Sequence, residues 1–372
     1  MMRNPGLDCL RGLAILLVIG NHLGIRIGLA DTALANVLPH WLLMALNYNG
    51  GEGVTIFFVL SGFLIATRVM QCCGSLDNIQ AVPFILHRGA RILPCLLGLL
   101  AVIGILDWMG FKDYSFTKPG QSFLGAATAA LGLYFNVWQA NHGWSVAGIT
   151  VLWSLSIEEL FYLGFPSLCR VPKRILVGLL ALLAVIAPLY HSQLHGNEIW
   201  REQATLTGFG TIAMGVLAAI IGSSLQLSRS VSIMIGTGGT CLMLAEILAP
   251  AAWWHAVGDT MFAMLIMGTA MLVLACHWLP MVGGVGSWWL RRMGQLSYEI
   301  YLTHMFVVMA AVRLFRANDL PLAQGWMVYP ICLVLIWLLG EAIFRLFSRP
   351  VAAFLDQHFV RLRKSDAGPV SV

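Results

Sequence analysis

The chain has 372 residues, of which 59% are hydrophobic and only 10% are charged. A typical soluble domain carries roughly 25% charged residues, so this chain cannot cover a soluble surface. That excludes a cytosolic enzyme, a secreted disulfide scaffold and a disordered chain. The net charge of +5 comes without a dense basic stripe, which argues against a nucleic-acid partner. The composition predicts an all-α bundle that crosses a membrane many times.

Apolar runs of the length that a bilayer requires, about 20 residues per helix, recur along the whole chain. The candidate runs lie near residues 11–28, 53–70, 91–109, 122–140, 151–168, 174–190, 207–224, 231–249, 259–279, 297–315 and 327–347. Lys and Arg can decide which of these runs cross, because cytoplasmic loops are enriched in both residues.

Whether the run 122–140 crosses the membrane decides between two topologies. With a cytoplasmic N-terminus, sixteen of the 22 basic residues fall on the cytoplasmic side if this run does not cross, and only eight if it does. We therefore expect about ten spans with both termini cytoplasmic. The segment 122–140 is then re-entrant or lies at the outer face.

We expect a single domain, because no internal repeat or linker is visible. Its core covers residues 8–348 and is followed by a polar cytoplasmic tail at 360–372, with no extracytoplasmic esterase-like domain. The eight cysteines form no C-x-x-C pair and lie mostly in apolar runs, where cysteine behaves as a small hydrophobe. We expect neither a disulfide framework nor a metal site.

The first span carries two ionisable residues, which are costly inside a membrane. Arg11 and His22 are eleven residues apart, so both point the same way on a helix, roughly 16 Å apart along its axis. Asp8 lies one turn before Arg11 and can pair with it. This arrangement suits a long substrate with a phosphate head at the cytoplasmic mouth and a reactive tail near His22. The alternative is a snorkelling arginine and a histidine bonded to a neighbouring helix.

Further polar groups precede or enter later spans. Arg88 and Arg91 share one helix face before the third span, where guanidinium groups can bind phosphate or simply anchor the helix. Glu158 and Glu159 are adjacent, so both cannot face lipid, and Ser154 lies one turn before Glu158. The span that begins near residue 297 carries polar residues at helical spacing, namely Ser297, Tyr301 and His304. These residues share one face of the helix.

Together these motifs resemble family three of the integral-membrane acyltransferases, whose members move acyl groups, usually acetyl, from acyl-CoA to extracytoplasmic glycans and some small molecules. The matching segments, in chain order, are Asp8 to Ala14 with His22, Phe57 to Ile65, Arg88-x-x-Arg91 with Pro94, Trp153 to Glu158 with Phe161, Tyr162 and Pro166, and Ser297 to His304. Three positions, Cys9, Thr55 and Leu160, depart from the residues that the family usually has there. They bear on the choice of acceptor more than on the chemistry.

The resemblance implies an O-acyltransferase of the bacterial inner membrane that uses acetyl-CoA, without a metal. Arg11, Arg88 and Arg91 would hold the donor phosphates. His22 would be the general base or would carry the acyl group itself, and Glu158 would orient the imidazole or bind the acceptor. The resemblance implies supporting roles for Asp8, Ser61, Ser154, Tyr298 and His304.

The acceptor and one rival function stay open from the sequence. The acceptor is expected to be an envelope sugar, free or lipid-linked, such as an O-antigen or exopolysaccharide unit. A peptidoglycan sugar, an antibiotic or another small molecule is the alternative. The rival is a transporter of a small solute or lipid-linked sugar that uses His and Glu as a proton relay. The paired cytoplasmic arginines favour the enzyme.

Overall fold

The computed structural model describes residues 4–194, 196–249, 258, 260–279 and 284–355, so the expected tail at 360–372 lies outside the described residues. Within these ranges the regular elements are all helical, which confirms the predicted class. The α-helices are α1 (Pro5–Gly24), α2 (His40–Tyr48), α3 (Gly50–Cys73), α4 (Ala81–Trp108), α5 (Phe123–Leu131), α6 (Phe135–His142), α7 (Leu152–Leu168), α8 (Lys173–Gln193), α9 (Glu198–Glu202), α10 (Thr205–Ser224), α11 (Arg229–Ile247), α13 (Thr260–Trp278), α14 (Trp288–Gln295), α15 (Ser297–Ala317) and α16 (Val328–Ile343).

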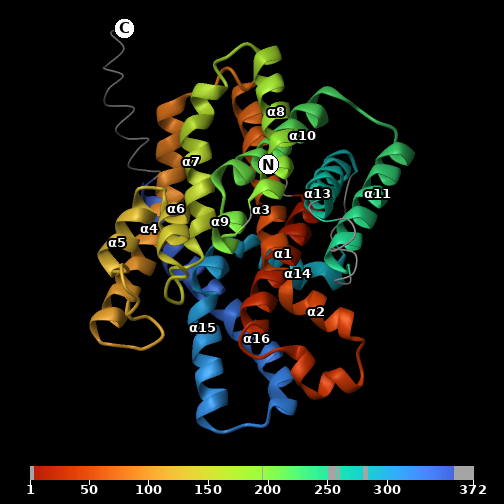
Figure 1. Cartoon of the computed structure of the whole chain (residues 1–372). Helices are drawn as coiled ribbons and strands as arrows, with labels where there is room; N and C mark the ends of the chain where they lie inside the picture. The colour runs from red at the N-terminus through yellow and green to blue at the C-terminus, as the bar shows by residue number, and fades with distance from the viewer. Residues whose placement is uncertain (1–3, 195, 250–257, 259, 280–283, 356–372) are drawn as a thin grey trace.

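Short helical turns complete the described elements. They are η1 (Leu29–Asp31), η2 (Ala33–Asn36), η3 (Val285–Ser287), η4 (Leu322–Met327) and η5 (Phe344–Ser348), of which η5 is a π-helix that continues α16. Figure 1 shows the long helices gathered into one bundle, with the α7–α8 connection at the top and the α15–α16 connection at the bottom.

Nine stretches of the described chain are long and apolar enough to cross a membrane. They correspond to nine of the ten predicted spans. The tenth, α7, has 17 residues, which places it at the short end of the range for a transmembrane helix, about 17–25 residues. The chain is therefore a multi-pass membrane protein. The orientation of its termini stays a prediction.

The segment 122–140 forms two short helices and no continuous span. α5 has 9 residues and α6 has 8, and each is far shorter than the about 20 residues that a crossing requires. Leu133 interrupts the two helices with a φ of 61°, a left-handed conformation that no α-helix can continue through. Figure 1 shows α5 and α6 on one side of the bundle, beside α4.

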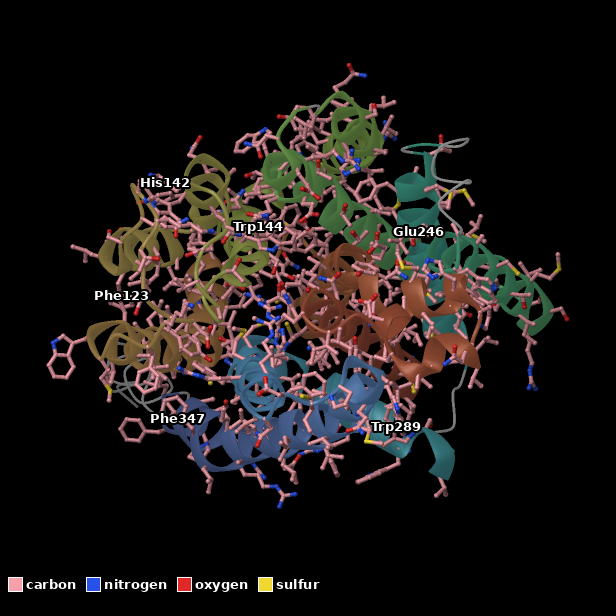
Figure 2. The ribbon with its side chains drawn as sticks, turned by 60° about the horizontal axis from the view of Figure 1, so that its bottom comes forward. Phe123, His142, Trp144, Glu246, Trp289 and Phe347 are labelled. Carbon is pink, nitrogen blue, oxygen red and sulfur yellow. The ribbon has the colours of Figure 1, made fainter. Side chains whose placement is uncertain are left out.

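Side chains at the rim of the bundle are apolar, as expected where lipid replaces water. Trp289 and Phe347 are 50% and 40% exposed, and Figure 2 shows both at the edge of the helix bundle. α8 and α16 are the least buried of the long helices that flank the bundle, with 22% of their apolar windows covered by protein. The polar groups predicted to matter lie elsewhere, on α1, α3, α4, α7 and α15.

The start of α1 is fixed locally. The Asn4 side chain accepts hydrogen bonds from the backbone N–H groups of Gly6 and Leu7. Pro5 occupies the first helical position, where a backbone N–H would have no partner within the helix. The helix then runs unbroken to Gly24, so the predicted register of Arg11 and His22 holds. α1 lies near the middle of the bundle, against α3, α14 and α15 (Figure 1).

The α3–α10 contact depends on glycine. A Cβ on Gly62 would overlap the carbonyl oxygen of Ile212, and one on Gly215 would overlap that of Val59. The two backbones thus touch directly, as small residues allow in membrane proteins. This contact sets the position of Ser61, the neighbour of Gly62.

We expect Gly62→Ala to lower the melting temperature of the detergent-solubilised protein. Overpacking of this kind costs about 1–3 kcal/mol, and here a backbone oxygen would have to move. Gly178→Ala is the matched control, because this glycine of α8 has open space around its Cα. The control should melt at or slightly above the wild-type temperature. Equal melting of the two variants would mean that α3 and α10 separate easily.

Candidate active site

A cavity of about 890 Å³ opens among α1, α3, α4, α7 and α15. Its size is within the range of about 300–1,000 Å³ found for small-molecule sites. The predicted site residues that line it are Asp8, Arg11, Ser61, Arg88, Arg91, Ser154, Glu158 and Tyr298. The fold therefore brings together eight predicted residues from five helices that are distant in the sequence.

Arg11 lies on the cavity wall at the N-terminal end of α1. Its Nη2 donates to the Ser297 hydroxyl over 2.8 Å, which joins α1 to the start of α15. Asp8 accepts a hydrogen bond of 2.9 Å from Gln295, at the end of α14. Sequence reasoning did not identify Gln295, because its partner lies 287 positions away.

The Arg88 guanidinium contacts three side chains of α7. Its Nη2 donates to Glu159 over 2.5 Å and lies 3.7 Å from Glu158, and its guanidinium stacks over the Tyr162 ring at 3.6 Å. The pair is partly shielded, with Arg88 and Glu159 side chains 20% and 15% exposed. Arg88 is thus a structural cation of this wall, whatever else it binds.

Arg91, one turn further along α4, has a different environment. It lines the cavity and is exposed. Within the described part of the chain it makes no hydrogen bond and no ion pair shorter than 4 Å. A guanidinium placed in this way can take an anionic ligand without losing a protein partner.

Glu158 is held by hydroxyl groups. Its Oε1 accepts from Ser61 over 2.7 Å and from Tyr162 over 3.1 Å. No hydrogen bond or ion pair joins Glu158 to His22 among the described residues. The sequence-based hypothesis that Glu158 orients the His22 imidazole therefore has no contact behind it in this structure.

His22 instead lies beside His304. The two rings are 5.1 Å apart between centroids, with 38° between their planes. His304 is completely buried, and its Nδ1 lies 2.9 Å from the Tyr301 carbonyl oxygen and 3.1 Å from that of Ile300. Because Arg11 meets Ser297 and His22 meets His304, α1 and α15 run side by side in the same direction.

The histidine pair lies outside the cavity lining, next to the Tyr301 side chain. Neither histidine belongs to the cavity lining, whereas Tyr301 and Phe57 do. The Tyr301 ring lies 6.1 Å from that of His304 and 6.3 Å from that of Phe57. The Tyr301 hydroxyl lies 2.7 Å from the Ser154 hydroxyl and donates to the Val151 carbonyl oxygen over 3.1 Å. Tyr301 therefore lines the cavity and at the same time neighbours His304.

Beyond the histidine pair, the same two helices carry Arg26 and Met309. Arg26 donates to the His22 carbonyl oxygen over 2.7 Å and contacts the Met309 sulfur at 3.1 Å. Tyr114, in the loop after α4, stacks on Phe306 of α15 at 5.6 Å. Burial raises the pKa of Tyr114 to about 12, so its hydroxyl stays neutral at physiological pH.

Tyr298 has a structural contact, since its hydroxyl donates to the Ile92 carbonyl oxygen over 2.7 Å and joins α15 to α4. Sequence reasoning did not predict that the Arg88 guanidinium stacks on the Tyr162 ring, or that Phe57 lines the cavity beside Tyr301. Both Tyr162 and Phe57 lie in the family motifs. Within the described residues no group of three or more His, Cys, Asp or Glu side chains is arranged to hold a metal.

These features define a class: a polytopic helical membrane protein with an arginine-lined cavity that ends beside a buried histidine pair. A family model for an acyltransferase domain, Acyl_transf_3, matches residues 4–344. The chain belongs to this family, which confirms the resemblance that its motifs indicated.

Named relatives agree with the family. OatA, an O-acetyltransferase of Staphylococcus aureus (strain NCTC 8325 / PS 47), is 24% identical over 372 residues, which cover 93% of this chain and 57% of OatA. YrhL of Bacillus subtilis (strain 168), which carries the provisional name of a peptidoglycan O-acetyltransferase, is 28% identical over 331 residues, 82% of this chain and 48% of YrhL. The chain spans about half the length of these curated relatives. No solved structure was found that matches it.

Proposed function

We propose that the protein is an O-acyltransferase of the bacterial inner membrane, which moves an acetyl group from acetyl-CoA to a hydroxyl of an envelope sugar. The observation that carries this proposal is the cavity itself. Arginines line it near the beginning of α1, and Tyr301 of its wall lies beside His304. A donor with a phosphate head and a thioester tail matches that order of groups.

The donor would bind with its phosphates against Arg91 and Arg11, and Arg88 would add positive charge from the wall. Guanidinium groups suit phosphates because they donate two parallel hydrogen bonds. The pantetheine arm would lie along α1 toward Tyr301. Side chains of the cavity wall such as Tyr301 would have to move for the thioester to reach His22, because His22 is not part of the cavity lining.

The transfer needs a base at the sugar hydroxyl. As the hydroxyl oxygen forms its bond to the thioester carbon, its proton passes to a ring nitrogen of His22. The C–S bond then breaks, and the CoA thiolate takes up that proton and leaves as a thiol. An imidazole suits both proton transfers, because its ordinary pKa lies near neutrality.

The first acceptor to test is a peptidoglycan amino sugar, because the provisional name of YrhL refers to peptidoglycan. Purified protein would be incubated with acetyl-labelled acetyl-CoA and peptidoglycan fragments. In parallel, mass spectrometry would compare the envelope glycans of cells with and without the gene. We expect label in an ester of the sugar and loss of that ester in the deletion strain. Unchanged glycan acetylation, with no acetyl-CoA consumed by the purified protein, would refute the proposal.

A further inference from the structure

His304 carries a buried acceptor without a partner. The residue is 0% exposed, and its Nε2 makes no hydrogen bond to any described residue. Its Nδ1 faces two backbone carbonyl oxygens, which can only accept. The proton of a neutral ring must therefore be on Nδ1, and Nε2 presents a lone pair. It is one of ten buried side-chain atoms without a partner in the described residues, and it lies on the ring that neighbours His22.

The neighbour of His304 suggests the reason. A hydrogen bond of about 3 Å between nitrogens of two imidazole rings places the ring centroids about 5 Å apart. The rings of His22 and His304 are 5.1 Å apart, so a rotation of the His22 ring is enough to form such a bond. In the described structure the His22 ring makes no hydrogen bond that such a rotation would break.

We propose that His304 is a positioning residue for His22: its Nε2 accepts the N–H of the His22 ring and so fixes which His22 nitrogen has the free lone pair. This inference rests on the proposed function of His22 as the base. In active sites where a general base activates a nucleophile, a third group orients the base in the same way. The hydrogen bond persists when His22 takes the proton of the sugar hydroxyl, because the N–H shared with His304 is on the opposite nitrogen.

The surroundings explain why this orienting group is an imidazole. The Oε1 of Glu158 contacts Ser61, Tyr162 and Arg88, and no hydrogen bond or ion pair connects the Glu158 carboxylate to His22 among the described residues. A carboxylate at position 304 would be a charge in a completely buried position, which is costly. A neutral ring supplies the same lone pair without that cost.

The test uses two amides of different length. The amide of His304→Gln reaches the place of Nε2, whereas that of His304→Asn reaches only the place of Nδ1. We expect the Gln variant to keep a kcat within about 10-fold of wild type, and the Asn variant to lose about 10²-fold or more. The KM for acetyl-CoA should stay unchanged in both. A structural role gives the reverse order, because the carbonyl contacts belong to Nδ1, and that order would overturn the proposal.

A second measurement covers the case in which the variants fold poorly. Solid-state NMR of the wild-type protein with ¹⁵N-labelled histidine should show an unprotonated Nε2 on His304 that accepts a hydrogen bond. Its resonance should move in His22→Ala. An unchanged resonance would refute the pairing. If wild-type protein consumes no acetyl-CoA, the proposed function fails. If wild-type protein is active and the Asn variant equals it, only the role of His304 fails.

Discussion

His22→Gln should abolish acetyl transfer while the protein remains folded in the membrane. Glutamine can still form hydrogen bonds, but it cannot take a proton at neutral pH. The loss in kcat should be at least about 10²-fold, the lower end for removal of a general base. Binding of acetyl-CoA should survive, because Arg11, one of the proposed phosphate-binding residues, lies roughly 16 Å away along α1. Isotope-labelled transfer and equilibrium donor binding, measured on the same preparation, would check both statements.

The matched control for this variant is His40→Gln. His40 is an exposed histidine at the start of α2, and its replacement should leave kcat and expression unchanged. If His22→Gln transferred acetyl at the wild-type rate with equal protein in the membrane, His22 would not be the base. If Gln kept activity and Ala reduced expression together with activity, His22 would be a packing residue.

Arg91→Ala should weaken acetyl-CoA binding without a change in melting temperature. Arg91 is an exposed cation of the cavity wall, so its loss would remove the proposed contact to the donor and would leave no described protein group without a hydrogen-bond partner. One charge-assisted hydrogen bond contributes about 1.5–3 kcal/mol, which corresponds to about 10- to 150-fold in affinity. Arg91→Lys should recover only part of this affinity, because the fork of two donors is lost. Calorimetric titration of the detergent-solubilised protein measures it.

Arg88→Ala is the informative comparison. Arg88 neutralises Glu159 and lies 3.7 Å from Glu158, so its removal leaves carboxylates in a shielded wall without their cation. We expect a lower melting temperature, and we expect Glu159→Gln in the same chain to restore part of it. A variant that melts like wild type and loses only donor affinity would show that the contact with Glu159 adds no stability. Arg91→Ala with full donor affinity would return Arg91 to a role in membrane anchoring.

Much of the fold could be predicted from local signals. Mean hydropathy along the chain located the long helices, and the count of basic residues identified 122–140 as the run that does not form a span. The structure agrees there because Leu133 breaks the run into two short helices. The shared face of Arg11 and His22 was also predictable, since it depends only on the period of one continuous helix.

The partners of the site residues were not predictable in this way. The motifs indicated Arg88, Arg91, Glu158 and His304 by type and position, but nothing local to them distinguishes a paired arginine from an unpaired one. Which side chain lies beside His22 was not visible in the sequence either. One of the two roles expected for Glu158, orientation of the His22 imidazole, would place it beside His22, whereas the structure places His304 there. The other role, binding of the acceptor, stays a prediction.

The sequence by itself determined that this protein is a helical membrane bundle and at which positions ionisable residues enter its apolar helices, because hydropathy and helical period are properties of short segments. Only the tertiary structure decided that Arg88 meets Glu159, that Tyr301 lines the cavity beside His304 and that His22 meets His304. The physical reason is distance along the chain. α1 and α15 are separated by more than 270 positions, and their alignment follows from the close packing of helices such as α14 against α1, where a Cβ on Gly294 would overlap the Asp8 carbonyl oxygen.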